Sequence, residues 1–306
     1  MEAIFIIAFL ILLGYFLKNR GLLTEKDKTA LNNIVLQVGF PALIFVSMLR
    51  NVHAAELESY LKLTLFILII CIFCIILSYF IGKALKLPPK SLAAFVLVCA
   101  CGNTAFIGFP VITGFYGNDG FTRAIFCDAV TLIVLIILST YLASKISRQK
   151  VNIFRQILKF PSTIAWVLSL ILILCGIDLS HFPTIAVTIL DMISALVVPL
   201  IMLSIGISLS PKYLKIALVP AILVTALHSI IAPVAGLFLT NAFQFSELDK
   251  KVAVLQAGMP PAMMSAVFSE LYDFDTKLIS AAIFLATGFA LISIPVWHLL
   301  LEAGWV

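Results

Sequence analysis

Charge is scarce in this chain of 306 residues, in which only 11% of the residues are Asp, Glu, Lys or Arg and 62% are hydrophobic. The mean hydropathy is +1.17, a composition that soluble domains of this size do not have. The sequence also has no Walker loop for direct ATP coupling and no cofactor motif. Because the connections between its apolar segments are short, no separate soluble domain is expected. The sequence therefore predicts an all-α membrane protein whose membrane part carries the whole function.

Apolar runs long enough to cross a membrane follow one another along the whole chain. A hydrocarbon core of ~30 Å needs roughly 20 helical residues, and we place ten such segments. They lie near residues 3–17, 29–49, 61–82, 91–115, 121–144, 160–178, 184–209, 213–240, 250–270 and 277–301.

The positions of Lys and Arg predict the orientation of these segments, because cytoplasmic connections carry the excess of basic residues. Fifteen of the 20 basic residues fall in one set of alternate connections and five in the other. Both termini are therefore expected on the outer side of the cytoplasmic membrane. The most basic connection is expected in the cytoplasm. The net charge of +5 reflects topology, so nucleic-acid binding has no support.

An odd number of helices on each side of the basic connection predicts two inverted repeats, a common design of secondary carriers. Pro41 and Pro199 lie 158 positions apart, and so do Asn103 and Pro261. Each half thus has a proline-bearing second helix and an interrupted fourth helix. The expected units are the first repeat at 1–145, a cytoplasmic loop at 146–159 and the second repeat at 160–306.

Two of the apolar segments, the fourth and the ninth, are interrupted by glycine and proline. Gly102-Asn103 should break the fourth, and Pro260-Pro261 should end one half-helix and open another in the ninth. Lipid cannot satisfy the freed backbone groups, so such breaks are buried in protein or line a cavity. The N-termini of the two new half-helices would converge from opposite sides and favour a carboxylate. Because no Lys or Arg lies in the middle of a predicted helix, these termini would be the main attraction for an anion. Simple packing kinks are the alternative.

The residues around the two breaks resemble the two crossover helices of the auxin efflux carrier family, which includes plant auxin exporters and bacterial transporters of malonate and other organic acids. The similarity covers essentially the whole chain. Its motifs are Asn103-Thr104, Gly108, Pro110, Gly114 and Tyr116-Gly117 in the first half, and Gln256-Ala257, Pro260, Val267-Phe268, Glu270 and Tyr272 in the second.

This resemblance implies ten helices in two inverted repeats, with helices 4 and 9 crossing at their breaks. It implies a scaffold of helices one, two, six and seven, a moving domain made of the others, and an elevator motion that carries the crossover across the membrane. It also implies a homodimer. The long cytoplasmic loop of the plant exporters is missing here.

The candidate substrate-binding residues lie at or beside the breaks. Asn103, Thr104, Gln256 and Ser265 can bond a carboxylate or water, although an Asn in a membrane helix often serves an interhelical hydrogen bond instead. The full set is Gly102, Asn103, Thr104, Gly108, Pro110, Gln256, Pro260, Pro261 and Ser265.

Ionisable side chains within the membrane are costly and are therefore candidates for coupling to H⁺ or Na⁺. Asp128, Asp191 and His228 are these candidates; an interfacial Asp or a His bonded to a carbonyl is the alternative. Cys71 and Cys74 have C-x-x-C spacing, but nothing completes a metal site.

We expect a secondary transporter that moves a small organic anion or an amphipathic weak acid, auxin-like or a dicarboxylate. A cation or proton antiporter that uses Asp128 and Asp191 as ligands is the competing hypothesis. An enzyme is not expected. The one catalytic arrangement that the sequence suggests is an aspartyl pair formed by Asp128 and Asp191, and no other catalytic motif stands out. The substrate's identity and the direction of transport stay open.

Overall fold

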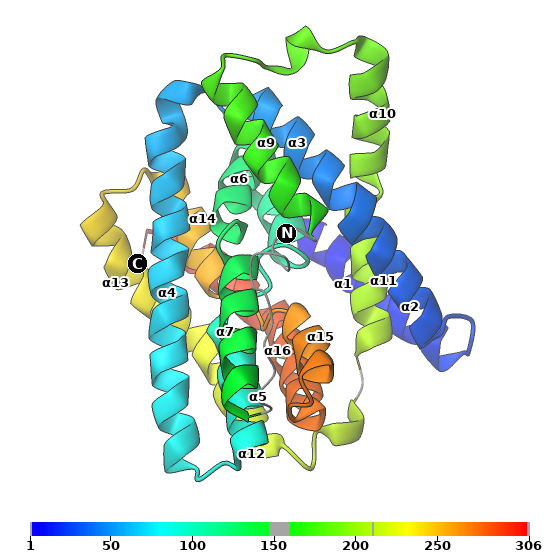
Figure 1. Ribbon diagram of the computed structural model, residues 1–306, viewed down its shortest axis with the longest axis vertical. Coiled ribbons are helices and arrows are strands. Elements are labelled where there is room, and N and C mark those ends of the chain that lie inside the picture. The colour runs from blue at the N-terminus through cyan, green and yellow to red at the C-terminus, as the bar shows by residue number, and fades with distance from the viewer. Residues whose placement is uncertain (1, 147–159, 210, 305–306) are drawn as a thin grey trace.

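The computed structural model describes residues 2–146, 160–209 and 211–304, and within these ranges its regular structure is helical apart from one isolated β-bridge (Figure 1). Most of the predicted 146–159 loop therefore lies outside the described residues. The helices of the first half are α1 (Glu2–Asn19), α2 (Glu25–Ile34), α3 (Phe40–Asn51), α4 (Leu57–Ala84), α5 (Pro89–Ala100), α6 (Gly108–Asp128) and α7 (Thr131–Ile146). Those of the second half are α9 (Pro161–Leu174), α10 (Thr184–Ala195), α11 (Val197–Ser208), α12 (Leu218–Ala226), α13 (Ala232–Phe243), α14 (Glu247–Ala257), α15 (Met264–Leu271) and α16 (Thr276–Glu302).

Every predicted apolar segment contains helix, which confirms the all-α membrane class. Among the described residues, six stretches are long and apolar enough to cross a membrane: Lys26–Asn51, Ala54–Ala84, Gly108–Ile146, Thr184–Tyr213, Leu218–Phe243 and Thr276–Glu302. Shorter apolar helices cover Phe5–Asn19, Pro89–Ala100 and Pro161–Leu174. The count of ten crossings and the inverted repeat stay predictions.

Three prolines each follow an interruption of a long helix. A π-helical turn, Val35–Gly39, precedes Pro41, and a second one, Leu227–Ile231, precedes Pro233. Leu196 separates α10 from α11 just before Pro199. A proline lacks its N–H and its ring clashes with the carbonyl four residues earlier, so the preceding turn widens or breaks. The sequence therefore sets where these helices bend.

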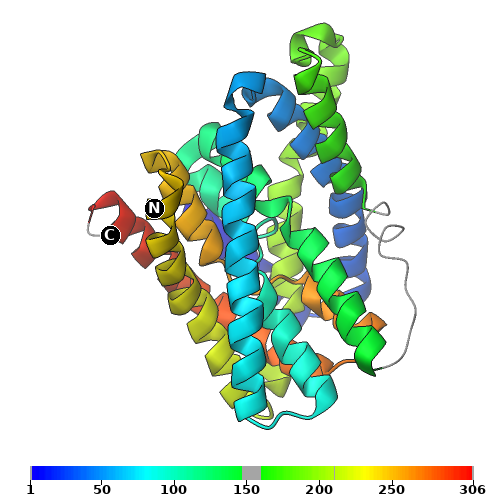
Figure 2. The same cartoon turned by 60° about the vertical axis from the view of Figure 1, so that its left-hand side comes forward.

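The helices pack into two groups that meet along α6 and α16. In one group α1 packs on α11, α3 packs on α9 and α10, and α2 packs on α11. In the other, α4 packs on α5, α6, α13 and α14, while α12 and α5 pack on α16. The main contacts between the groups join α1 and α3 to α6. Figures 1 and 2 show α9 alongside α3, with the α9–α10 connection at one end of the molecule.

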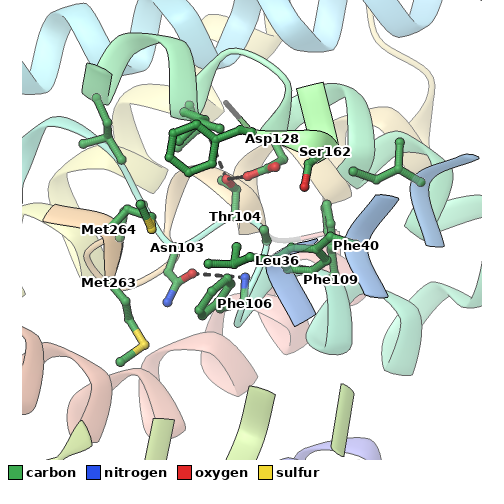
Figure 3. Close-up of a pocket in the computed structure, with 18 residues that line it drawn as sticks. Leu36, Phe40, Asn103, Thr104, Phe106, Phe109, Asp128, Ser162, Met263 and Met264 are labelled. Carbon is green, nitrogen blue, oxygen red and sulfur yellow. Dashed lines mark hydrogen bonds between the residues drawn. The ribbon is translucent and has the colours of Figure 1, made fainter. Parts of the chain in front are cut away.

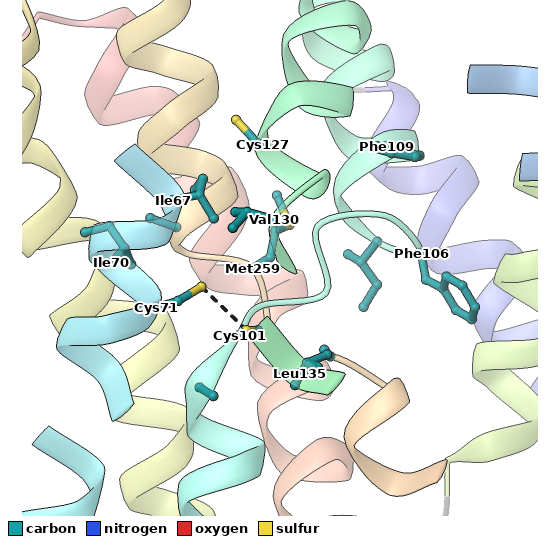
Figure 4. Packing of buried hydrophobic residues seen from close by; sticks show 14 of the residues in the cluster. Ile67, Ile70, Cys71, Cys101, Phe106, Phe109, Cys127, Val130, Leu135 and Met259 are labelled. Atoms are coloured by element: carbon teal, nitrogen blue, oxygen red, sulfur yellow. Dashed lines mark hydrogen bonds between the residues drawn. The ribbon is translucent and has the colours of Figure 1, made fainter. Parts of the chain in front are cut away.

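The core is densest where α4, α5, α6 and α14 surround the two interrupted segments. Figure 4 shows Cys71 of α4 against Cys101, with Val130 and Met259 beside them. All four side chains are buried. Burial of these apolar groups helps to fix the position of the interrupted backbone, because this backbone is not held by intrahelical hydrogen bonds.

Candidate functional site

The two interrupted segments cross each other as extended chains. Between α5 and α6 and between α14 and α15 the backbone leaves the helix, and Gly102 pairs with Pro261 in an antiparallel bridge. The N–H of Asn103 donates to the carbonyl oxygen of Pro260 at 2.6 Å, and the N–H of Ala262 donates to that of Cys101 at 3.0 Å. Each break thus satisfies backbone groups that the other has freed, which is how such irregular backbone survives at membrane depth.

The expectation that Pro260-Pro261 would open a new half-helix is wrong. Helix α14 ends at Ala257 and α15 begins at Met264, so both prolines lie in the extended crossing. The bridge explains the difference, because its two hydrogen bonds use the carbonyl of Pro260 and the N–H of Ala262 and require no N–H from either proline.

Two glycines allow the segments to approach closely. A Cβ atom on Gly102 would lie 3.0 Å from the carbonyl oxygen of Met259. A Cβ atom on Gly108, the first residue of α6, would lie 2.3 Å from Oε1 of Gln256. The Gln256 side chain is buried and donates from Nε2 to the carbonyl oxygen of Thr104 at 3.3 Å. Gln256 therefore holds the first break in place from the second half of the chain.

A cavity of about 70 Å³ opens beside the crossing, and Figure 3 shows its lining. The crossing supplies polar groups, and η1 (Val35–Gly39), α3, α7 and the start of α9 supply mainly apolar ones. The lining residues are Leu36, Phe40, Ile44, Gly102, Asn103, Thr104, Ala105, Phe106, Phe109, Asp128, Thr131, Leu132, Leu135, Phe160, Ser162, Ala262, Met263 and Met264.

Asn103 presents an unsatisfied hydrogen-bond donor in this lining. Its Oδ1 accepts from the backbone N–H of Phe106 at 3.1 Å, which fixes the side chain. Its Nδ2 is buried and has no partner. Within the described part of the chain, the backbone N–H groups of Thr104, Ala105 and Met263 also donate to no backbone carbonyl. An unpaired buried donor is costly, so this cluster is suited to an occupant that brings acceptors.

Asp128, the last residue of α6, lines the same cavity. Its Oδ1 accepts a hydrogen bond of 2.5 Å from the hydroxyl of Thr104, which also lies 3.2 Å from the hydroxyl oxygen of Thr131. The structure thus brings together Gly102, Asn103, Thr104 and Asp128 from the predicted set around one cavity.

The remaining candidates lie elsewhere. The Ser265 hydroxyl donates to the carbonyl oxygen of Ala262 at 2.6 Å, and Pro110 is buried in the first turn of α6. His228 is buried behind the crossing, where its Nε2 lies 3.2 Å from the carbonyl oxygen of Val98. Asp191 pairs with Arg50 at 2.8 Å where α10 packs on α3, and both side chains are 43% exposed.

Sequence reasoning missed the apolar wall of the cavity. The ring of Phe40 packs against Phe106 and Phe109, with centroid separations of 5.4 Å and 5.7 Å. Phe106 and Phe109 lie within the first motif, and that proximity was the one available signal. Aromatic side chains in an apolar segment have the same sequence pattern whether they face lipid or a cavity.

A buried ion pair was also missed. Nε of Arg123 on α6 lies 2.5 Å from Oδ1 of Asp249 on α14, and the Asp249 side chain is only 4% exposed. The hydroxyl of Ser246 donates to the other carboxylate oxygen at 2.7 Å. This network ties the two interrupted helices together away from the cavity.

Comparisons with known proteins agree with this architecture. The sequence profile of the family described as "Membrane transport protein" matches residues 1–298. An uncharacterized transporter from Methanocaldococcus jannaschii is 36% identical over 308 residues, which cover 100% of this chain and 98% of the relative. One from Methanothermobacter thermautotrophicus is 34% identical and covers 98% of each chain, and one from Escherichia coli K12 is 23% identical over 94% of this chain and 93% of its own. The chain therefore belongs to the membrane transport protein family, the auxin efflux carrier family that the crossover motifs indicate, and is a multi-pass membrane transporter, not an enzyme.

Proposed function

We propose that this transporter is a secondary carrier of a small organic anion or amphipathic weak acid, auxin-like or a dicarboxylate, and that the acid binds in the cavity beside the crossing. The observation that carries the proposal is that Asn103, which lines that cavity, has a buried Nδ2 with no partner among the described residues. A carboxylate would supply the acceptors that this donor and the neighbouring backbone N–H groups lack.

The lining favours a particular kind of acid. No Lys, Arg or His of the described residues lines the cavity, so among them the carboxylate would be held by neutral donors and by the partial positive charge where helices begin. The apolar lining includes Leu36 and Phe40 on the facing helices and Phe109 and Met264 on the helices that follow the two breaks, which suits an apolar body. At about 70 Å³ the cavity has room for several waters or a small ligand, and a larger acid would require the wall to move.

The packing of the helices in two groups supports an elevator-type alternating access. The crossing and Asp128 belong to the group that contains α4 to α7 and α12 to α16, whereas Phe40 and Ile44 belong to the other group. Movement of one group past the other would replace one wall of the cavity and leave the polar wall unchanged. We place the carrier in the cytoplasmic membrane as a homodimer with both chain ends outside.

A cation or proton antiporter is the second candidate, and the position of Asp128 in the cavity favours it. The antiporter hypothesis drawn from the sequence used Asp191 as a second cation ligand. Asp191 does not line the cavity and already pairs with Arg50, so an antiporter would depend on Asp128 alone. Flux measurements distinguish the two functions, since a carrier moves labelled organic anion in proteoliposomes and an antiporter moves cations without it.

The decisive experiment compares Asn103→Asp with the wild type. This change keeps the acceptor that holds the Phe106 N–H and replaces the free donor by a carboxylate oxygen. Asn32→Asp is the matched control, because Asn32 lies on α2 and its Oδ1 accepts from the hydroxyl of Ser204 away from the cavity. A panel of carboxylates is screened by thermal stabilisation, where a ligand at ~100 times its dissociation constant adds ~2.7 kcal/mol.

We expect one class of acid to stabilise the wild type and Asn32→Asp, and Asn103→Asp to lose the effect. Hydrogen bonds to a charged group contribute ~1.5–3 kcal/mol, so affinity should fall by ~10-fold to ~150-fold. Labelled uptake should fall in parallel. Equal binding by all three proteins would contradict the proposed site, and stabilisation by Na⁺ alone would favour the antiporter.

A further inference from the structure

Asp128 is the one carboxylate among the described residues that line the cavity, and it borders a second cavity as well. This second cavity has a volume of about 190 Å³ and shares Ile44, Asp128, Leu132 and Ser162 with the first. Oδ2 of Asp128 accepts no hydrogen bond from the described residues, so the Thr104 hydroxyl on Oδ1 is its one direct partner among them. The carboxyl group therefore stands at the junction of two spaces.

No basic side chain in the described part of the chain pairs with Asp128. The elements packed around it, which are α3, α4, α7 and α9, present uncharged groups: Ile44, Thr64, Thr131, Leu132, Ser162 and Trp166. The titratable groups that interact with it are the thiols of Cys101, in the crossing, and Cys127, its neighbour on α6. An ionised carboxylate in such surroundings lacks a counter-charge and is strongly disfavoured.

An anion at Asn103 would make this imbalance worse. Both groups line one cavity of about 70 Å³, so a bound carboxylate and an ionised Asp128 would repel each other at short range with little water between them. A proton on Asp128 removes the repulsion.

We propose, on the basis of the proposed function, that Asp128 takes up one proton when the organic anion binds, so that the carrier moves one proton together with each anion. The step is a simple protonation, in which hydronium gives a proton to the Asp128 carboxylate and leaves water. The loaded site then holds the anion and a neutral carboxylic acid, with no other charged side chain among its described lining residues.

The Thr104 hydroxyl connects the protonation of Asp128 with the binding of the anion. When Asp128 is ionised, Thr104 uses its proton to bond Oδ1. When Asp128 is protonated, the carboxylic acid can donate to the Thr104 oxygen instead, which frees the Thr104 proton for the anion. Protonation of Asp128 thus removes a repulsive charge and adds a donor to the binding site.

The second cavity offers the proton a route that does not pass through the anion. It is large enough for water and is lined by the hydroxyl-bearing residues Thr64, Ser162 and Thr163. Nε1 of Trp166, another of its lining residues, is buried without a partner. Water held by this donor and the hydroxyl groups would reach Asp128 from the side opposite the crossing.

The test measures the dissociation constants of indole-3-acetate and malonate for the purified protein between pH 6 and 8, in sodium and in N-methylglucamine buffers. We expect the wild-type dissociation constant to rise towards tenfold per pH unit at the alkaline end, in both buffers. Asp128→Asn, which is neutral at every pH, should bind with the acid-limit affinity of the wild type and with no pH dependence. Asp191→Asn, the matched control, should keep the wild-type profile, and Thr104→Val should bind more weakly while keeping the slope.

A count of protons completes the test and needs no variant. Wild-type proteoliposomes that contain a pH-sensitive dye should acidify by one proton for each labelled anion that enters. If wild type binds neither acid at any pH, the proposed function fails for these acids. Three results would overturn the proton coupling and leave the anion site standing. They are a wild-type dissociation constant that does not change with pH, a pH dependence that persists in Asp128→Asn, and entry of anions without protons. A dissociation constant that responds to sodium and not to pH would also overturn the coupling.

Discussion

The contact between α1 and α11 allows a sharp test of the fold, because two glycines permit the backbones to touch. A Cβ atom on Gly206 would lie 2.1 Å from the carbonyl oxygen of Ile11 and 2.7 Å from the backbone nitrogen of Tyr15. A Cβ atom on Gly14 would lie 2.3 Å from the carbonyl oxygen of Leu203. These obstacles are backbone atoms, which cannot rotate away as a side chain can. Close approach through small residues is a known source of helix association in membranes.

We predict that Gly206→Ala destabilises the protein by about 2–3 kcal/mol, in the upper part of the ~1–3 kcal/mol range for overpacking, because backbone atoms cannot move aside. The helices must separate by roughly 1 Å to admit the methyl group, and a gap of that size forfeits a quarter to a half of the dispersion energy across the contact. The double variant Gly14→Ala/Gly206→Ala should cost clearly less than the sum of the two single changes, since one separation accommodates both methyl groups.

Gly288→Ala is the matched control. Gly288 lies inside α16, and a Cβ atom there would meet nothing within 4 Å. Alanine should therefore be neutral or stabilise by up to ~1 kcal/mol through helix propensity. The assay is reversible unfolding in mixed micelles with increasing dodecyl sulfate. Equal midpoints for Gly206→Ala and Gly288→Ala would refute the close approach of α1 and α11.

Two further changes test the surroundings of the crossing. Gly108→Ala should displace the Gln256 side chain and break its hydrogen bond to the crossing. Because one neutral hydrogen bond contributes ~1 kcal/mol, anion binding should weaken severalfold. Titration calorimetry measures this affinity, and an unchanged value would show that Gln256 does not position the site. Arg123→Ala should cost ~3–5 kcal/mol because it leaves the carboxylate of Asp249 buried and unpaired. Lys62→Ala is the control, because it removes an exposed ion pair within α4 and should cost under ~0.5 kcal/mol in the same unfolding assay. Similar losses of stability in Arg123→Ala and Lys62→Ala would contradict the burial of the Arg123 pair.

The places where the chain departs from regular helix are readable from its glycines and prolines. Gly102 and Pro261 lie in apolar runs where helix would otherwise continue, and both are in the crossing. The π-helical turn before Pro41 follows from the geometry of proline in the same way. The pairing of the two breaks could not be predicted, because a bridge between residues 102 and 261 depends on the packing of helices that are distant in sequence.

The site was predictable where polar groups sit on the crossing itself and less so where they lie on its flanking helices. Asn103 and Thr104 line the cavity as expected, but Ser265 bonds its own chain at Ala262. Asp191 lies near the start of the predicted 184–209 segment and Arg50 directly follows the 29–49 segment, a signal that could have suggested their ion pair. A single sequence does not specify which face of a buried helix meets a cavity, so these assignments needed the structure.

The bridge between the breaks has a mechanical consequence for any transport motion. Separating the two segments would leave the Asn103 and Ala262 N–H groups and their two acceptors unpaired, and each unsatisfied buried group costs ~1–3 kcal/mol. The Arg123 and Asp249 pair joins the same two helices a second time. The crossing should therefore move as one body together with Asp128, while Phe40 and Ile44 belong to the helices it would move against. A substrate bound to Asn103 would then keep its polar contacts throughout the motion and exchange only the apolar groups that η1 and α3 supply, which are the least costly surface to replace within a membrane.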